Sequence, residues 1–455
     1  MRSLLHRLSF AVLSAAAPFA AQAGAPNMAP IPPAAVAAPL PASPSAPTRV
    51  GRVSLVLGKV GFRAAGASDW SAAAPNFPVA AGEALRTDTQ SRVALEIGPQ
   101  TLDLAPGSEL RIAGLDRQRI ELVLQGRLYL HLRPRDAGET IAIALPQGGV
   151  QVSAPGEYDI DSGGPNQPAR ISAFTGSARF AGTVIASGHT AALAAAKPAL
   201  ATQGPAAADA FDAWSRLQDY QQAKLASPYY ISPEMTGYAA LDGHGNWEKS
   251  AEYGEVWYPD GLPANWAPYR YGHWQRIAPW GWTWIDDQPW GFAPSHYGRW
   301  ALIGKRWGWV PGRFVEDPAY VPAVVAFLGT PGVGVSVAGS STPAIGWFPL
   351  APGEVYWPSY SRNLDYVRDL NKGDLDDPAA VALEPDGNPP VEITVGQFAN
   401  RRMASVVPRP DFVAGHPVAP ALLQLPLERL VDAPVITGSP RLGPAPAPRP
   451  TVAAG

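Results

Sequence analysis

Between residues 49 and 195, apolar residues recur in short runs that Gly or Pro interrupts. Residues 120–124 place Ile, Leu and Leu at every second position, and residues 128–132 repeat the pattern after Gln125-Gly126. A period of two predicts strands, because successive side chains of a strand point to opposite faces. Many such runs at close spacing, without a long helical pattern between them, predict an all-β sandwich, roll or solenoid.

One amphipathic helix is predicted after this β-region. Phe211, Trp214 and Leu217 recur every third residue, and the pattern ends before Pro228. Pro205 suits the first turn of a helix. We expect the apolar stripe to pack against a neighbouring domain, and the alternative is that it binds a partner.

Residues 247–309 contain eleven tryptophans in two related copies. Tyr-Gly-His-Trp at 271–274 precedes one Trp-Gly-Trp, and Tyr-Gly-Arg-Trp at 297–300 precedes another. Two β-hairpins explain the repeat, since both Trp of Trp-Gly-Trp project on one face of a strand. Aliphatic residues are few here, so the region cannot fold unless most indole rings are buried. Only a small minority of rings is expected to be exposed.

The rest of the chain predicts a second, smaller β-region. Residues 324–328 and 333–337 flank Gly-Thr-Pro-Gly, which predicts a hairpin. Residues 361–370 predict a short helix and residues 391–395 predict a strand. The Pro-rich end, from about Pro434, is expected to be disordered.

Composition excludes several classes of protein. Lys plus Arg is 35 and Asp plus Glu is 38, which gives a formal net charge of −3 and no support for nucleic-acid binding. The chain has no cysteine, which excludes disulfides, thiolate metal sites and Cys nucleophiles. Its 45 Gly and 51 Pro favour short strands, turns and linkers.

The N-terminus has the pattern of an export signal. Arg2 and Arg7 precede an apolar stretch at 8–17, and Ala21-Gln22-Ala23 follows. The stretch is too short for a membrane-spanning helix. We therefore expect signal cleavage near Ala23 and a periplasmic or extracellular protein without a transmembrane span.

Several segments of the first β-region resemble the FecR-type periplasmic domain. They lie at 53–60, 78–87, 91–93, 155–160 and 171–176, and they include Gly82-Glu83-Ala84-Leu85-Arg86-Thr87 and Pro155-Gly156-Glu157-Tyr158. The resemblance implies a roll or sandwich of short strands. Family members with a signalling role are membrane-anchored regulators that contact a sigma factor and an outer-membrane receptor. This chain departs from them because no internal segment is long and apolar enough to span a membrane.

The Trp-rich region is similar to an uncharacterised domain family of exported Gram-negative bacterial proteins, which commonly follows a FecR-like domain. The matching segments are 232–238, 256–259, 266–269 and 290–300, and residues 347–354 and 400–413 resemble its downstream continuation. The family has no established activity. The resemblance therefore implies a domain order and an exported protein but no reaction.

Few residues suggest chemistry. The phosphate-binding pattern G-x-x-x-x-G-K-[ST], the hydrolase pattern G-x-S-x-G and the zinc pattern H-E-x-x-H do not occur. His273 and His296 occupy different repeat positions, so no zinc pair is predicted. Asp286 and Asp287, beside Trp284, suggest a glycoside-hydrolase carboxylate pair, but adjacent residues tend to point apart and a turn is favoured. We predict a non-enzyme without cofactor or metal site.

The predicted fold class is mainly β, with a FecR-like roll or sandwich, a linker helix, a Trp-rich hairpin repeat domain and disordered Pro-rich ends. The predicted order is a signal peptide at 1–23, an Ala/Pro-rich linker at 24–48, a FecR-like β-domain at 49–195, a helical linker at 196–228, a Trp-rich repeat domain at 229–312, a small β-region at 313–418 and a Pro-rich tail at 419–455.

The function hypothesis is an exported envelope protein with an interaction or scaffolding role, whose partner is a cell-envelope protein or a glycan. One alternative is a soluble FecR-type regulatory component. The other is a glycan- or peptidoglycan-binding module that uses exposed aromatic residues. Its candidate ligand-binding residues are Trp284, Trp290, His296, Tyr297, Arg299 and Trp300.

Overall fold

The computed structural model describes residues 45–135, 138–164, 167–180, 182–193, 201–222, 226–329, 334–335, 343–382, 398–436, 438–440 and 442. Within them the chain is mainly β, as predicted. The predicted signal peptide, the strand at 391–395 and the end of the Pro-rich tail lie outside the described residues.

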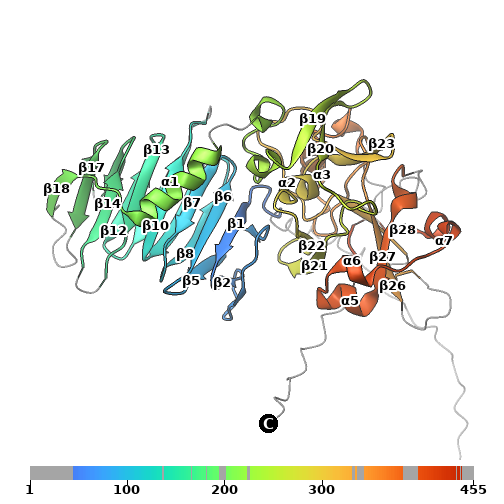
Figure 1. The fold of residues 1–455 in the computed structure, drawn as a ribbon, viewed down its shortest axis with the longest axis horizontal. Helices are drawn as coiled ribbons and strands as arrows, with labels where there is room; N and C mark the ends of the chain where they lie inside the picture. The colour runs from blue at the N-terminus through green and yellow to red at the C-terminus, as the bar shows by residue number, and fades with distance from the viewer. Residues whose placement is uncertain are drawn as a thin grey trace, which may run out of the picture. The chain divides into compact units, whose positions relative to one another are not determined.

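Residues 51–205 form two nine-stranded sheets that share one hydrophobic core (Figure 1). The first sheet contains, in spatial order, β18 (Ala201–Pro205), β17 (His189–Leu193), β14 (Ala169–Ala173), β13 (Gly156–Asp161), β10 (Arg127–Leu132), β7 (Gln100–Leu104), β6 (Arg92–Ile97), β1 (Gly51–Leu57) and β4 (Pro78–Val79). The second contains β16 (Thr183–Ile185), β15 (Ala178–Phe180), β12 (Gly148–Val152), β11 (Thr140–Leu145), β9 (Arg119–Gln125), β8 (Glu109–Leu115), β5 (Ala84–Thr87), β2 (Val60–Arg63) and β3 (Ser71–Ala72).

The chain passes repeatedly from one sheet to the other. After β8 and β9 in the second sheet, for example, it enters the first sheet at β10. Gly126 makes this crossing with φ of 92°, and a Cβ there would lie 2.3 Å from the Ser108 hydroxyl oxygen. Ile120 and Leu128, which share the predicted period of two, therefore point into one core from opposite sheets.

Helix α1 (Ala210–Gln222) crosses the first sheet (Figure 1), but only part of the predicted apolar stripe packs against it. Phe211 is buried with Ala105 and Tyr129, and Trp214 packs against this cluster. Leu217 is 57% exposed and Trp214 is only half-buried. The buried positions of the helix are mostly polar, and they are Phe211, Asp212, Ser215 and Asp219. Pro205 ends β18 and lies outside the helix, so its predicted place in the first turn is wrong.

Arginines on the outer face of the first sheet explain this orientation. Arg127 lies 3.2 Å from Asp212, and Arg133 lies 2.9 Å from Asp219. The Thr101 hydroxyl also donates to Asp219 at 2.7 Å. Charge-assisted contacts in a partly buried setting are stronger than the burial of one Leu, so the acidic side of the helix turns inward.

Residues 227–436 form three smaller sheets around an aromatic core. One four-stranded sheet contains, in spatial order, β19 (Gly245–Ser250), β20 (Gly254–Pro259), β24 (Arg306–Val310) and β23 (Arg299–Ile303). A two-stranded sheet contains β21 (Gly272–Ile277) and β22 (Gly281–Asp286). The other four-stranded sheet contains, in spatial order, β27 (Ser405–Pro408), β26 (Ala344–Pro349), β25 (Val325–Leu328) and β28 (Val435–Ile436). The helices among the described residues of this region are η1 (Ser227–Tyr229), η2 (Tyr238–Leu241), α2 (Phe292–His296), α3 (Leu364–Asn371), η3 (Pro378–Ala380), η4 (Arg401–Met403), α5 (Arg409–Ala414), α6 (Val418–Ala421) and α7 (Leu427–Asp432).

The two hairpins predicted from the repeat are confirmed, as β21–β22 and β23–β24. Each places one Trp opposite another across the strands: Trp274 faces Trp284, and Trp300 faces Trp309. The rings of the first pair meet edge to face at 5.5 Å, a favourable aromatic geometry. The copies differ in their partners, because only the second hairpin joins a larger sheet.

The prediction of a tryptophan core is also confirmed. Of the eleven rings between 247 and 309, ten are buried and Trp247 is half-buried. Trp290 illustrates the packing, with its ring 5.0 Å from that of Trp257 and 5.8 Å from that of Trp266. Indole rings thus supply the apolar area that aliphatic residues supply elsewhere.

Downstream, the helix predicted at 361–370 is present as α3, but the hairpin of 324–328 with 333–337 is wrong. Both edges of β25 are occupied by β26 and β28, and Val335 forms a bridge with Ala344 instead. Strand β28 lies just beyond Pro434, where disorder was predicted to begin. Pairing with a distant strand orders this Pro-rich segment.

Candidate functional site

The six residues predicted to bind a ligand are all at most 5% exposed. Their polar atoms are used inside the fold. The indole N–H of Trp284 donates to Asp286 at 2.8 Å, and that of Trp300 donates to the Pro294 carbonyl at 2.9 Å. None of the six therefore presents an open ring face to a ligand in this structure.

The side chain of Arg299 is bonded to other groups of the fold. Its guanidinium donates to the Glu354 carbonyl at 3.0 Å and to the Asn371 side chain at 2.8 Å, and it lies 2.9 Å from Asp374. These contacts connect β23 to α3 and to the segments on either side of that helix. The planar fork of arginine suits such a multiple anchor.

His296, Tyr297 and Arg299 do line one small cavity, of about 40 Å³, which has room for a few water molecules. His296 Nδ1 donates to the Val321 carbonyl at 2.8 Å. Burial lowers the pKa of His296 to about 3, because it disfavours the imidazolium. The ring is therefore neutral over the physiological range.

The adjacent carboxylates of Asp286 and Asp287 point apart. Asp286 is buried and accepts from the Trp284 indole and from the Gln288 amide at 2.9 Å, whereas Asp287 is exposed. Burial raises the pKa of Asp286 to about 7. The two groups do not face a common space, which is what a carboxylate pair flanking a glycosidic bond requires.

A surface groove of about 380 Å³ is the strongest candidate binding site. It lies between the β19–β20 hairpin, the loop after β20 and the β23–β24 turn, and we call it the aromatic groove. Three aromatic residues line it: Tyr258, Trp266 and Trp307. Exposed polar residues surround them, namely Asn246, Glu248, Asp260, Lys305 and Arg306.

Two side-chain pairs hold the polar rim in place. Arg306 lies 2.6 Å from Glu248 and places its guanidinium 3.9 Å from the centre of the Tyr258 ring. Asn246, which pairs with Tyr258 across β19 and β20, donates to Asp260 at 2.8 Å. The rim therefore offers an ordered set of donors and acceptors beside aromatic rings.

The indole N–H groups of Trp266 and Trp307 are unpaired in the part of the chain that the structure describes, and neither is shut off from solvent. Trp284, Trp300 and Trp309, in contrast, donate to groups inside the fold. Both residues line the aromatic groove, and their indole N–H groups are accessible to water.

Sequence reasoning missed this groove. Trp266 and Trp307 were assigned to the core with the other rings, and both are indeed at least 92% buried. The rim residues come from three separate segments and have no motif in common. The only local signal is the cluster of polar residues in the turns at 260 and 305, which is typical of any hairpin.

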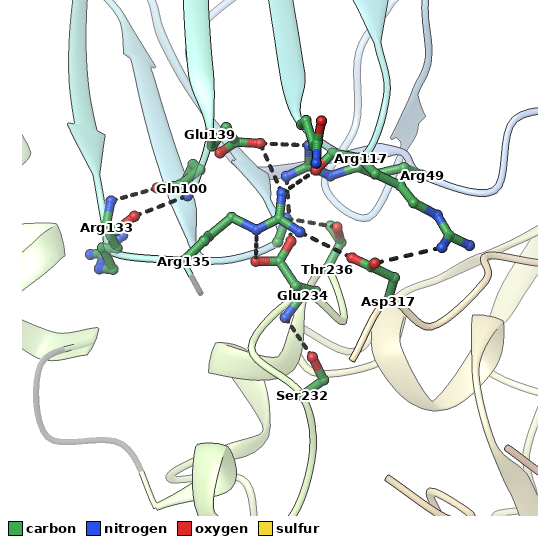
Figure 2. A network of polar contacts seen from close by, with 12 residues as sticks. Arg49, Gln100, Arg117, Arg133, Arg135, Glu139, Ser232, Glu234, Thr236 and Asp317 are labelled. Atoms are coloured by element: carbon green, nitrogen blue, oxygen red, sulfur yellow. Dashed lines mark hydrogen bonds and ion pairs between the residues drawn. The ribbon is translucent and has the colours of Figure 1, made fainter. Parts of the chain in front are cut away.

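A second feature is a charged network that joins the two-sheet region to the Trp-rich region (Figure 2). Glu234 lies 2.5 Å from Arg135 and 3.4 Å from Arg49. Glu139 pairs with the same two arginines, at 3.3 Å and 2.6 Å. Arg135 also reaches Asp317 at 3.0 Å, and Figure 2 shows it pointing between Glu234 and Asp317.

Uncharged contacts extend this network. The Thr236 hydroxyl accepts from the Gly98 amide and donates to the Val50 carbonyl, both at 2.9 Å. Further along, the Asn76 amide donates to the carbonyls of Asp286 and Gln288 at 2.8 Å and 2.7 Å. The turn that suggested a carboxylate pair is therefore a docking point for the β-domain.

The described residues can also be compared with the requirements of a metal site and of a membrane-spanning helix. No three His, Asp or Glu side chains among them are grouped as ligands for a metal ion. No helix among them combines the length and apolar character that crossing a bilayer requires.

One family model matches part of the chain. Residues 238–354 match the family described as "Family of unknown function (DUF6600)", a match confined to the Trp-rich region and the strands that follow it. This agrees with the resemblance to an uncharacterised domain family. The FecR-like resemblance stays a prediction. No curated protein matches the chain.

Two crystal structures of a candidate anti-sigma factor from Parabacteroides distasonis ATCC 8503 are similar to parts of the chain, each at 12% identity. The first match has a TM-score of 0.26 and covers 29% of this chain and 64% of that chain, which is less than two thirds of its length. The second has a TM-score of 0.24 and covers 39% of this chain and 97% of that chain. Scores this low support no conclusion about function.

Proposed function

We propose that this is an exported, non-enzymatic protein of the bacterial cell envelope that binds a partner through the aromatic groove. The observation that carries the proposal is the groove itself, in which the edges of largely buried aromatic rings lie beside an ordered, exposed polar rim. Concave sites with an apolar floor and a few placed polar groups are the usual form of binding sites.

The charged network supports a scaffolding role, because it fixes the Trp-rich region to the β-domain. Glu234, Arg135 and Glu139 have side chains that are at most 10% exposed. Removal of one partner from such a buried network leaves an unpaired charge, which costs about 3–5 kcal/mol. The Trp-rich region that carries the groove is thus attached to a large β-domain rather than linked to it loosely.

The placement of the titratable groups supports a binding role over catalysis. Asp286 is buried against Trp284 while Asp287 faces outward. His296 is buried among aromatic rings, with Tyr320 at 4.7 Å, and is neutral. General acid–base catalysis needs a group that reaches the reacting atoms and changes its protonation near the working pH.

Location and binding can be tested together in a Gram-negative host that expresses the full chain with a C-terminal tag. We expect the protein in the periplasmic or extracellular fraction, with a mature N-terminus just after Ala23. A photo-crosslinking amino acid in place of Lys305, at the groove, should capture an envelope component. The same amino acid in place of Arg276, an exposed residue of the other hairpin, is the matched control.

Retention in the cytoplasm with an uncleaved N-terminus would contradict the export part of the proposal. Equal cross-linking from positions 305 and 276, or none from either, would contradict binding through the groove. Turnover of a glycan by the purified protein would contradict the non-enzymatic assignment.

A further inference from the structure

We infer that the aromatic groove binds a neutral saccharide. This inference rests on the proposed function, because it names the class of ligand that the groove would hold. It concerns residues other than the six buried ones that the sequence suggested for glycan binding, and it follows from the charge, the donors and the size of the groove.

The charges of the rim favour a neutral ligand over a strongly charged one. Glu248 and Asp260 contribute two negative charges, and Lys305 and Arg306 contribute two positive ones. The rim is therefore neutral as a whole, and Arg306 is already paired with Glu248 at 2.6 Å. A phosphate or a polyanion would meet two carboxylates, and a cation would meet two basic groups, whereas a neutral ligand meets no net repulsion.

The hydrogen-bonding groups match a ring that carries many hydroxyls. Asn246 and Asp260 form one pair on the rim, in which the amide donates at 2.8 Å and the remaining oxygens still accept. Trp266 and Trp307 line the same groove, and their indole N–H groups are unpaired within the described residues. Hydroxyl groups both donate and accept, so a saccharide satisfies such a mixed set, and a purely apolar ligand would leave it unpaired.

The size and the exposure of the rings define how such a ligand would bind. A groove of about 380 Å³ is near the small end of ligand sites, which suits one or two sugar units. Trp266 and Trp307 are only 8% and 7% exposed, so they offer edges and N–H groups rather than broad faces. Affinity then comes mainly from hydrogen bonds made in competition with water, and we expect a Kd on the order of 0.1–1 mM.

Nuclear magnetic resonance can test the inference on the full mature chain labelled with ¹⁵N-tryptophan. The probes are the neutral trisaccharides triacetylchitotriose and maltotriose, with a sulfated disaccharide as the anionic comparison. The Trp266 and Trp307 indole signals, assigned with Trp266→Phe and Trp307→Phe, should shift with at least one neutral probe. The Trp284 signal should not shift, because its N–H is bonded to Asp286 inside the fold and its ring packs against Trp274, away from the groove.

A matched pair of substitutions then locates the site. Asn246→Ala removes one rim group from an exposed position and should raise the Kd roughly threefold to tenfold. Arg276→Ala, at an exposed position of the other hairpin, should leave the Kd unchanged. The dispersion of the remaining indole signals shows that each variant is folded.

Three results would overturn the inference: no indole shift at tens of millimolar of either neutral probe, shifts with the sulfated probe alone, or equal effects of Asn246→Ala and Arg276→Ala. These results are distinguishable from failure of the proposed function. Export and cross-linking from position 305 do not depend on a saccharide, so they can succeed with a protein partner while the titration fails.

Discussion

Burial controls the protonation of several carboxyl groups in the folded chain. Desolvation raises the pKa of Glu83, Asp103, Glu234 and Asp286 to about 7 each, from ordinary values of 4.5 for Glu and 3.8 for Asp. Between about pH 4 and pH 7, these groups therefore keep their protons in the folded state, whereas the same groups are ionised in the unfolded state. Their contribution to stability is fully present below the unfolded pKa and is lost as the pH rises through the folded pKa.

Glu83→Gln tests this linkage at one residue. Glu83 is 2% exposed, and among the described residues its side chain has one hydrogen bond, from the Ala80 amide, which a Gln oxygen can also accept. We expect the variant to lose less free energy of unfolding than the wild type between pH 5 and pH 8, as measured by urea denaturation. Glu428→Gln, at an exposed position, should keep the wild-type dependence. An unchanged slope in Glu83→Gln would contradict the prediction.

The tryptophan core makes a second prediction at the residue scale. Trp300 is 2% exposed and fully enclosed, whereas Trp247 is half-buried. Trp300→Ala should reduce the free energy of unfolding by about 3–5 kcal/mol, because it leaves a cavity that neighbouring rings cannot fill. Trp247→Ala should cost clearly less in the same denaturation experiment. Equal losses of the free energy of unfolding would contradict the prediction that the buried Trp300 contributes more to stability than the half-buried Trp247.

At the scale of elements, α1 shows that a helix can bury its acidic side. Asp219 lies between Arg133 and His131, at 2.9 Å and 3.1 Å, and Thr101 donates to it. The outer face of the sheet thus selects which face of the helix packs. The amphipathic pattern predicted the helix and the packing of Phe211, but not the burial of Asp212 and Asp219, because the partner surface is largely polar.

Two substitutions on α1 separate the predicted stripe from the observed interface. Leu217→Ala, at a position that is 57% exposed, should change the free energy of unfolding by no more than about 0.5 kcal/mol. Asp219→Ala should cost about 3 kcal/mol or more, since Arg133 loses its ion-pair partner in a partly buried setting. Chemical denaturation followed by circular dichroism measures both. A larger loss of the free energy of unfolding for Leu217→Ala than for Asp219→Ala would contradict the prediction and would show that Leu217 belongs to the packed face of the helix.

At the scale of the whole molecule, the network around Glu234 joins regions that lie far apart in the sequence. Arg135 is bonded to Glu139 from its own β-domain and to Glu234 and Asp317 from the other region. Arg49 and Arg135 each have one carboxylate partner in the β-domain and one in the other region, so removal of Glu234 takes a partner from both arginines. The joint should therefore make the two regions unfold together.

Glu234→Gln tests this cooperativity, and Glu316→Gln, at an exposed position nearby, is the matched control. In the wild type, denaturation curves from tryptophan fluorescence, which reports mainly the Trp-rich region, and from far-ultraviolet circular dichroism should coincide. In Glu234→Gln we expect the fluorescence and circular-dichroism curves to have different midpoints. In Glu316→Gln we expect the two midpoints to coincide. Coincident midpoints in Glu234→Gln would show that other contacts are sufficient for coupling.

Local pattern was enough to predict much of this protein. A period of two in residues 120–132 gave inward-facing leucines, and the repeated Tyr-Gly-x-Trp segments gave two hairpins with a tryptophan core. These features depend on contacts between near neighbours and on the scarcity of other apolar residues, both of which are visible in a single chain. The same information predicted α3 at 361–370.

Long-range placement was decided by the tertiary structure alone. The polar face of α1, the pairing of β25 with β28 and the network around Glu234 join residues separated by tens to hundreds of positions. The aromatic groove arises in the same way, since Asn246, Trp266 and Arg306 come from three segments that only the folded sheet brings together. Burial and charge pairing are properties of an environment, and that environment exists only after the chain has folded.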